Sequence, residues 1–297
     1  MRQYQICNRC VMDTTDPDIV FDSNGICNHC ISAIKLYKSI TEDKNRDMKL
    51  NTIINEIKEV GKERKYDCVI GVSGGIDSTY IAYKVKELGL RPLAVHLDNG
   101  WDSELAVRNI EKTLKVLNID LYTYVLDWEE FKDLQISFIK ASVPHSEHPT
   151  DHAIVATLYK IANQNNIKYI IYGSNTSTES IGVKSWSGGQ LDWKYIKNVH
   201  KRFGNVKLKS YPHVSGFGLL YYKRVKKIKT LNILDYINYL KADALKLLED
   251  KLGWVYYGGK HHESIYTKFF QTYILPQKFN IDKRKTHLSS LICNGEI

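Results

Sequence analysis

The stretch Cys68-Val69-Ile70-Gly71-Val72-Ser73-Gly74-Gly75-Ile76-Asp77-Ser78 decides the fold of this chain. Its first five residues form a short apolar run rich in β-branched side chains, which is typical of a buried strand. Residues 79–88 then place apolar side chains at helical spacing, and Gly89 supplies a helix C-cap. The stretch therefore predicts a strand, a glycine-rich turn and a helix, in that order.

A turn of this kind before a helix is suited to binding an anion. Glycines let backbone N–H groups approach the anion closely, and the N-terminal end of the helix dipole favours negative charge. Serine hydroxyls add donors, and a carboxylate can hold a magnesium ion on bound phosphates, a role we assign to Asp77. The pattern is not that of a Walker loop, and a plain tight turn with two glycines is the alternative. The predicted phosphate-binding residues are Gly71, Ser73, Gly74, Gly75, Asp77 and Ser78.

Further strand and helix patterns alternate along the chain. Apolar runs at 92–97, 121–125 and 169–172 predict three more strands, and amphipathic patterns predict helices. This alternation indicates an α/β fold with a doubly wound parallel sheet. The predicted helices lie at 48–62, 103–117 and 151–165, with another at 232–249.

In such a sheet, ligands bind beyond the carboxyl ends of the strands. His96 and Asp98 end the second predicted strand, and Gly173 and Asn175 follow the fourth, so we expect all four to contact ATP. His96 and Asp98 have the alternative role of capping the next helix. Asp151 and His152 begin a helix, where they either bind substrate or act as an N-cap.

The C-terminal third contains a second polar cluster. Residues 258–264 read Gly-Gly-Lys-His-His-Glu-Ser and join several titratable groups in one short stretch. The spacing His-Glu-x-x-His is absent, so we expect a general base or a substrate clamp rather than a catalytic metal; ordinary polar loop residues are the alternative. The glycine-rich turn at 185–189 predicts a mobile loop over the site. Lys283, in a basic cluster, is placed to reach a pyrophosphate.

Four cysteines lie in the first thirty residues as two C-x2-C pairs: Cys7, Cys10, Cys27 and Cys30. Each pair can turn two thiolates towards one metal ion, so the pattern predicts a structural zinc site, with disulfides as the alternative. Of the other two cysteines, Cys68 begins the first strand and is expected in the core. Cys293 has no partner nearby in the sequence.

Composition limits the class of protein. The chain has 297 residues and a net charge of +9, and its positive charge is concentrated late: residues 181–297 contain 21 Lys+Arg and 8 Asp+Glu. A basic surface of this kind fits a polyanion or an acidic protein. No apolar run approaches about 18 residues and the start lacks a signal-peptide core, so we expect a cytoplasmic protein with no membrane partner. Three units are expected: a zinc module at 1–45, a nucleotide domain at 46–182 and a substrate-binding region at 183–297.

The loop at 71–78 resembles that of the N-type ATP pyrophosphatases. With the knuckles at 7–30, the segments at 96–101, 149–152 and 173–175, and those at 258–264 and 269–285, the chain is similar over nearly its whole length to the N-acetyl sugar amidotransferases of bacterial surface-glycan pathways. Members of that family run on past residue 297, so the chain is expected to be a short member or a truncated one.

The resemblance implies that ATP is split to AMP and pyrophosphate. AMP then activates the N-acetyl oxygen of a nucleotide-linked sugar, and ammonia from a partner glutaminase with a cyclase-like subunit, similar to those of histidine biosynthesis, displaces it. The implied cofactors are ATP, Mg²⁺ and structural zinc. The residues expected to take part in catalysis are Asp77, His262 and Glu263. Those expected to bind the sugar substrate are Asp151, His152, Lys260, His261 and Ser264.

Two other functions stay open at this stage. A tRNA thiolation enzyme also combines zinc knuckles, this loop and a basic surface, but it commonly needs additional cysteines, and only Cys68 and Cys293 remain. A zinc-ribbon protein that binds nucleic acid without turnover would explain the basic C-terminal third, although it leaves Asp77 without a role. Nucleic acid is therefore not the expected partner.

Overall fold

Five parallel strands form one sheet in the part of the chain that the computed structural model describes, residues 3–186 and 191–297. The strand order is β3-β2-β1-β4-β5, so the first strand in sequence lies at the centre. Each neighbouring pair is parallel, and the β1–β2 register aligns Cys68 with Pro92. The strands are β1 (Cys68–Gly71), β2 (Pro92–Asp98), β3 (Asp120–Val125), β4 (Tyr169–Ile171) and β5 (Lys229–Leu231).

The central strand is buried on both faces, which explains its continuous apolar sequence. Cys68 and Ile70 belong to the hydrophobic cluster on one side of the sheet, and Val69 belongs to the cluster on the other side. The same alternation places Ala94 of β2 on the first side and Leu93 on the second. Successive side chains of a strand point to opposite faces, so a β-branched apolar run suits this position.

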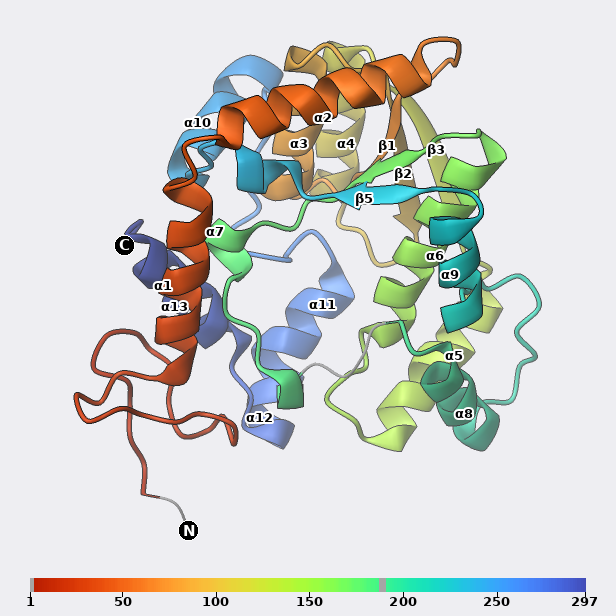
Figure 1. Cartoon of the computed structure of the whole chain (residues 1–297). Helices are drawn as coiled ribbons and strands as arrows, with labels where there is room; N and C mark the ends of the chain where they lie inside the picture. The colour runs from red at the N-terminus through yellow and green to blue at the C-terminus, as the bar shows by residue number, and fades with distance from the viewer. Residues whose placement is uncertain (1–2, 187–190) are drawn as a thin grey trace.

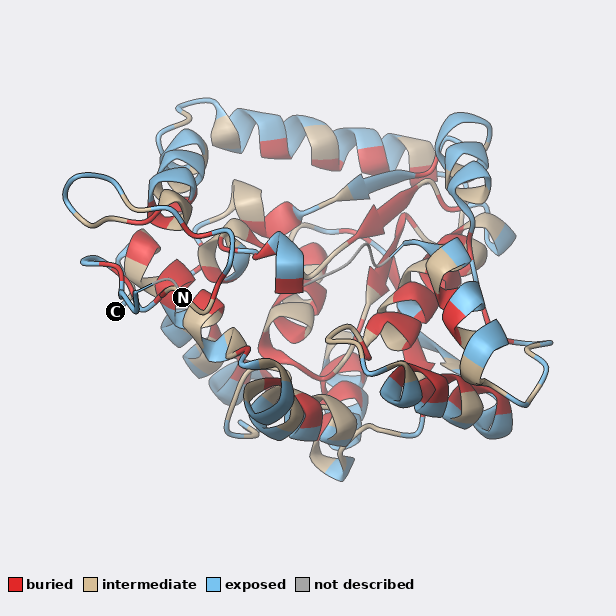
Figure 2. Cartoon of the chain, turned by 90° about the horizontal axis from the view of Figure 1, so that it is seen from below, coloured by how far each residue is buried: buried red, intermediate tan, exposed pale blue. Residues whose placement is uncertain are grey.

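Helices cover both faces of the sheet (Figure 1), and the burial colouring shows buried positions on the strands and on one face of many helices (Figure 2). The first cluster is completed by α2, α3, α4 and α10, and the second by α6 and α9. Helices α5 and α8 pack on each other beside the end of β2. Their bounds are α2 (Arg46–Gly61), α3 (Ile76–Glu87), α4 (Glu104–Leu117), α5 (Trp128–Ala141), α6 (His148–Gln164), α8 (Trp193–Phe203), α9 (Gly216–Arg224) and α10 (Lys241–Leu252).

The two ends of the chain pack together at one side of the sheet (Figure 1). Helix α1 (Asn28–Thr41) lies against α13 (Lys283–Asn294), and both contact the short α7 (Thr176–Glu179). The four N-terminal cysteines share a hydrophobic cluster with Phe270 and Leu275, so the first and last expected units have a common core. The elements that directly precede α13 in the chain are α11 (Ile265–Phe269), a π-helical turn (Phe270–Ile274) and α12 (Leu275–Phe279).

The doubly wound parallel sheet expected from the sequence is confirmed. One predicted helix is wrong in its bounds: residues 232–249 were expected to be helical throughout, but Ile233–Tyr236 forms a 3-10 turn and α10 begins only at Lys241. The fifth strand was not predicted, because Lys-Thr-Leu carries no apolar run. The loop expected at 185–189 falls largely outside the described residues, since only Lys184–Trp186 precedes the gap, as a 3-10 turn.

Among the described residues, no helix combines the length and the apolar character that crossing a bilayer requires.

Candidate active site

The turn between β1 and α3 has the geometry that its glycines predicted. Gly74 adopts φ +76°, and a Cβ there would lie 2.5 Å from the carbonyl oxygen of Ala106, so only glycine fits. Gly75 is the N-cap of α3. The Ser78 hydroxyl lies 3.2 Å from the Ser73 amide nitrogen, whose hydrogen bond it accepts, and it donates to the carbonyl oxygen of Gly75 at 3.1 Å. These contacts hold the turn open at the helix N-terminus.

The C-terminal part of the chain supports this turn from behind. Trp254 is 2% exposed, and its indole Nε1–H donates to the carbonyl oxygen of Gly74 at 2.9 Å. Tyr257 places its hydroxyl 3.3 Å from the amide nitrogen of Ile76 and accepts that hydrogen bond. Residues about 180 positions apart in sequence therefore fix one loop.

Asp77 stands in the first turn of α3 and faces a cavity of about 540 Å³. Burial raises the pKa of its carboxyl group, while Lys260 nearby and a hydrogen bond donated by the Tyr239 hydroxyl act in the opposite direction. A buried carboxylate at a phosphate-type loop is a suitable ligand for a magnesium ion. Asp77 is therefore the carboxylate of this loop that could hold a magnesium ion.

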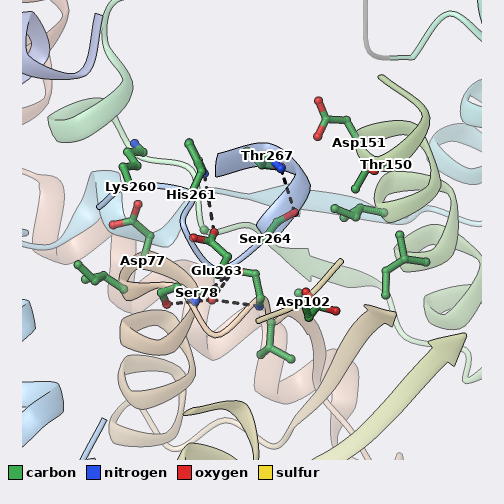
Figure 3. A pocket seen from close by; sticks show the side chains of 18 of the residues that line it. Asp77, Ser78, Asp102, Thr150, Asp151, Lys260, His261, Glu263, Ser264 and Thr267 are labelled. Atoms are coloured by element: carbon green, nitrogen blue, oxygen red, sulfur yellow. Dashed lines mark hydrogen bonds and ion pairs between the residues drawn. The ribbon is translucent and has the colours of Figure 1, made fainter. Parts of the chain in front are cut away.

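The opposite wall of the cavity contains Lys260, His261, Glu263 and Ser264 (Figure 3). Lys260 Nζ lies 2.9 Å from Glu179 Oε1, which anchors the loop on α7. His261 Nδ1 lies 3.8 Å from Glu263 Oε1, and the backbone oxygen of Glu263 accepts a hydrogen bond from the amide of Ser103 at 2.8 Å. The loop therefore has both a side-chain and a backbone tether.

Glu263 is the group of this wall that points most directly at the phosphate-type loop. A Cβ on Gly75 would come within 3.1 Å of Glu263 Oε1, and Oε2 is buried without a hydrogen-bond partner in the described residues. Burial acts to raise the pKa of Glu263, but the nearby His261 outweighs it, and the net result is a lowered pKa. Glu263 is therefore a carboxylate with one oxygen free to accept a proton from a bound ligand.

The end of β2 contributes a histidine–carboxylate pair. His96 Nδ1 lies 2.9 Å from the carbonyl oxygen of Val72, and its Nε2 lies 3.2 Å from Asp102 Oδ2. Burial acts to lower the pKa of His96, whereas Asp102 raises it, and the net shift is upward. Both side chains line the cavity.

Two carboxyl groups, those of Glu147 and Asp151, lie at another end of the cavity, and Figure 3 shows Asp151 there, away from Asp77. Glu147 accepts hydrogen bonds from Gln271 Nε2 at 2.9 Å and from Lys283 Nζ at 3.3 Å. Asp151 faces the same space from the first turn of α6, and burial, with a contribution from Glu147, raises its pKa to about 7. This end can hold polar groups of a ligand at some distance from the loop.

Most of the predicted site residues line this one cavity. The residues that do so are Gly71, Ser73, Gly75, Asp77, Ser78, His96, Asp151, Gly173, Lys260, His261, Glu263, Ser264 and Lys283.

Five predicted residues are not part of the lining. Gly74 supports the turn from behind, and Asp98 instead accepts a hydrogen bond from the amide of Gly100. Asn175 is the N-cap of α7. His152 is fully buried, with Nε2 accepting from the amide of Val214 at 3.1 Å, and His262 lies beside Gly259 rather than towards the cavity. These five residues contact other parts of the protein and do not face the cavity.

Several lining residues were missed from the sequence. They come from several elements, and long-range folding brings these elements together at the site. Lys241, for example, lies far from any motif, whereas Tyr257 directly precedes the polar cluster at 258–264 and Asp102 follows the second strand closely enough to have been noticed. The missed polar residues of the lining are Asn99, Asp102, Glu147, Thr150, Thr178, Glu179, Lys241, Tyr257, Thr267 and Gln271.

The four N-terminal cysteines form a second candidate site, away from the cavity. All four are buried, and their sulfur atoms lie within 4.8 Å of one another. Backbone amides of Arg9 and Met12 donate to the sulfurs of Cys7 and Cys10 at 3.4 Å, the pattern that stabilises thiolates in a knuckle. This donor set fits a tetrahedral zinc ion.

Cys293 was expected to be isolated, but its sulfur lies 3.5 Å from that of Cys30. Helix α13 brings it there, so this fifth thiol covers the cluster. The expectation for Cys68 is confirmed, because it is fully buried in β1.

Comparison with known proteins adds two sequence relationships. Residues 263–297 match the family described as LPS biosynthesis protein WbpG-like, C-terminal domain. A tRNA-specific 2-thiouridylase MnmA 2 from Fusobacterium nucleatum subsp. nucleatum is 30% identical over 142 residues, which are 44% of this chain and 38% of that protein. The chain therefore matches well under half the length of this curated relative.

Distant structural similarities accompany these matches. NMN synthetase from Francisella tularensis is 18% identical with a TM-score of 0.35, covering 74% of this chain and 94% of that one. An NH3-dependent NAD synthetase from Campylobacter jejuni subsp. jejuni NCTC 11168 is 17% identical with a TM-score of 0.34, covering 73% and 93%. A predicted tRNA methyltransferase subunit from Methanocaldococcus jannaschii is 15% identical with a TM-score of 0.35, covering 62% and 75%.

The parallel sheet, with its glycine-rich loop between the central strand and α3, defines an α/β protein whose loop is suited to binding phosphate groups. Over residues 263–297 the chain is similar to the C-terminal domain of the WbpG-like LPS biosynthesis proteins.

Proposed function

We propose that this protein is an AMP-forming amidotransferase that converts the N-acetyl group of a nucleotide-linked sugar into an acetamidino group during surface-glycan biosynthesis. The observation that carries the proposal is the composition of one cavity. Its floor is the phosphate-type loop, and its opposite wall comes from the WbpG-like segment, which contributes Glu263, Ser264 and Gln271. A segment typical of glycan enzymes thus faces the place where ATP would bind.

The chemistry needs two displacements. The amide oxygen of the N-acetyl group attacks the α-phosphorus of ATP, and pyrophosphate leaves. Ammonia then adds to the carbon of the adenylated imidate, and loss of AMP leaves the amidine. In sum, amide, ammonia and ATP give amidine, AMP and pyrophosphate. The first step converts the amide oxygen, a poor leaving group, into part of AMP, a good one. The second step then displaces AMP, which is why ATP is consumed.

The loop and its surroundings supply the electrostatics of the first step. Amides at the N-terminus of α3 and the hydroxyls of Ser73 and Ser78 face the cavity, where they can bind phosphate oxygens. Asp77 would hold the magnesium ion, which when bound would neutralise charge on the leaving pyrophosphate. Lys260 and Lys241 line the same space and add positive charge.

Glu263 is our choice for removing a proton from the attacking ammonia. One of its oxygens is buried without a partner among the described residues, and the carboxyl group lies beside Gly75. His262, the other residue considered, is outside the cavity lining. His261 is placed to keep Glu263 ionised through their ion pair.

Ammonia is proposed to come from a separate glutaminase acting with a cyclase-like subunit, and the reaction is placed in the cytoplasm, where ATP and nucleotide sugars are available. The basis for the partner is the family resemblance.

The sequence relationship to a tRNA thiouridylase favours one competing function, thiolation of tRNA. Sulfur transfer needs an accessible thiol, however. Cys68 is fully buried in β1, and Cys293 is buried against Cys30, so neither is free to carry sulfur to the cavity. We therefore rank thiolation, and nucleic-acid binding without turnover, below amidination.

The test is product analysis of labelled ATP with ammonium chloride and a panel of N-acetylated nucleotide sugars. We expect AMP and pyrophosphate with one sugar only, and that sugar should exchange oxygen for NH. Glu263→Gln should abolish the exchange, whereas His262→Asn should retain most of it. AMP release stimulated by tRNA instead of any sugar would establish thiolation, and ADP as product would contradict the assignment of the loop.

A further inference from the structure

Helix α9 has apolar side chains on its outer face. Phe217, Leu220 and Tyr221 follow the i, i+3, i+4 spacing of one helical stripe, and their exposed fractions are 87%, 53% and 46%. On the inner face, Leu219 and Tyr222 pack against the core of the sheet. The outer stripe is therefore apolar without contributing to the fold.

The stripe is held in a fixed position. The Ser215 hydroxyl caps α9 by accepting from the amide of Gly218 at 3.1 Å, and the rings of Tyr159 and Tyr222 stack at 5.4 Å. Val225, directly after the helix, adds another apolar side chain that is 64% exposed. Exposed apolar groups on a rigid element mark an interaction surface, since they are not needed for stability.

The charge around the stripe has one sign. Between Trp193 and Leu234 the sequence has 11 lysine or arginine residues and no aspartate or glutamate. Lys223, Arg224 and Lys227 are exposed on or next to α9, and within the described residues none of them forms an ion pair. The exposed cations on and next to α9 make this surface complementary to an extended array of negative charges.

We propose that α9 attaches the protein peripherally to a membrane surface rich in anionic lipid. The apolar stripe would enter the boundary between headgroups and acyl chains, and the flanking cations would contact lipid phosphates. A helix that has exposed cations beside an apolar stripe fits an anionic lipid layer, which offers both negative charge and an apolar interior, better than it fits a single acidic protein. This revises the expectation of no membrane partner, which considered only segments long enough to cross a bilayer.

The attachment is compatible with an open active site. No residue of α9 lines the cavity that holds the phosphate-type loop. Variants of the stripe can therefore be studied without altering the lining of that cavity. Membrane attachment and the amidotransferase function are tested independently, because lipid binding is measured for the first and product formation for the second.

The test is flotation of the full chain with lipid vesicles. Vesicles of phosphatidylcholine with about a third phosphatidylglycerol should carry the protein upward, and vesicles of phosphatidylcholine alone should not. Phe217→Ser/Leu220→Ser and Lys223→Glu/Arg224→Glu should each lower the bound fraction at least fivefold. All variants should keep the wild-type melting temperature and the wild-type rate of AMP formation in solution.

Matched controls change equally exposed residues elsewhere. Val107→Ser/Val116→Ser alters exposed apolar side chains of α4, and Lys35→Glu/Lys38→Glu alters exposed cations of α1. Both controls should float as the wild type does. Failure of the wild type to float with anionic vesicles at low salt would overturn the proposal. A wild-type dimer that Phe217→Ser/Leu220→Ser dissociates, without vesicle binding, would also overturn it and identify a second copy as the occupant.

Discussion

The ionised side chain of Asp77 destabilises the folded state, and its proposed role in catalysis explains why it is nevertheless present. The carboxyl group is buried at the cavity floor, where burial raises its pKa, so holding it ionised at neutral pH opposes folding. Tyr239 and Lys260 offset only part of this effect. Groups kept in such an environment are commonly functional, because a merely structural position would favour a neutral side chain.

Replacing Asp77 with asparagine should therefore separate activity from stability. We expect Asp77→Asn to lower AMP formation about 100-fold or more, because the magnesium ligand is lost. The melting temperature should stay equal or rise, since the buried charge is removed. Calorimetry and single-turnover assays measure the two effects. Tyr239→Phe, which keeps the carboxylate, should reduce activity far less, and a large stability loss in Asp77→Asn would contradict this account.

Asp151 gives a prediction about pH. Burial raises its pKa in the folded state to about 7, well above the ordinary value of an aspartate, so between the two values the folded state binds more protons than the unfolded state. This contribution to stability is present at low pH and is lost as pH rises to about 7. Asp151→Asn cannot ionise, so its melting temperature relative to wild type should rise between pH 5 and pH 8.

Thermal unfolding of both proteins across this range measures the difference. Asp250→Asn, at an exposed position on α10, controls for the loss of one negative charge. A difference between Asp151→Asn and wild type that stays flat with pH, or that falls, would show that Asp151 titrates in its ordinary range.

At the scale of elements, the segment after α10 acts as a brace for the phosphate-type loop. Trp254→Phe would remove the hydrogen bond to the Gly74 carbonyl and leave a small cavity in the core. We expect a loss of about 1–3 kcal/mol in the free energy of unfolding and weaker ATP binding. Denaturant unfolding and ATP titration test this. Trp128→Phe, at a residue 42% exposed, should have little effect on either, and unchanged ATP affinity in Trp254→Phe would show that the brace is not needed.

Helices and strands were predicted correctly where the pattern within their own sequence was sufficient to define them. Helices α2, α4 and α6 and the strands β1 to β4 have clear periodic patterns, and the glycine-rich loop carries its own geometry. Strand β5 is three residues long at the sheet edge, and its pairing with β4 stabilises it more than its sequence does. The start of α10 was misplaced because apolar spacing continues through the 3-10 turn before it.

The site was predictable to a similar degree. Motif residues such as Asp77 and Glu263 were identifiable because neighbouring residues share their chemistry. Glu147 and Lys241 lack such a context, and tertiary packing alone brings them to the cavity. His152 and His262 were selected for their position in a polar stretch, but side-chain direction within the stretch decides which groups face a ligand, and spacing does not specify that direction.

At the scale of the whole molecule, the cysteine cluster and the cavity share one helix. α13 places Cys293 beside Cys30 at one end and Lys283 in the cavity lining at the other. Lys285 of the same helix donates to Asp13 of the N-terminal module. Loss of a metal ion from the cysteine cluster should therefore disturb the position of Lys283 in the cavity where ATP is proposed to bind.

Removing zinc with a chelator should loosen both the N-terminal module and α13. We expect hydrogen exchange to accelerate in both segments and ATP affinity to fall, because Lys283 is no longer held in place. Cys27→Ser should act in the same direction. Cys68→Ala, which changes a core cysteine in β1, should keep one zinc per chain. Full ATP affinity in the metal-free protein would show that the two sites are independent.

The same contact has a consequence for how the chain is made. Cys30 and Cys293 are separated by 263 positions, so the ribosome releases the knuckles long before the helix that covers them. At common rates of synthesis the delay is roughly 15–50 s. Throughout that time the four thiols are without their cover, and early capture of a metal ion would protect them from oxidation. Zinc bound while the chain is still being synthesised would therefore protect the four thiols until α13 is made.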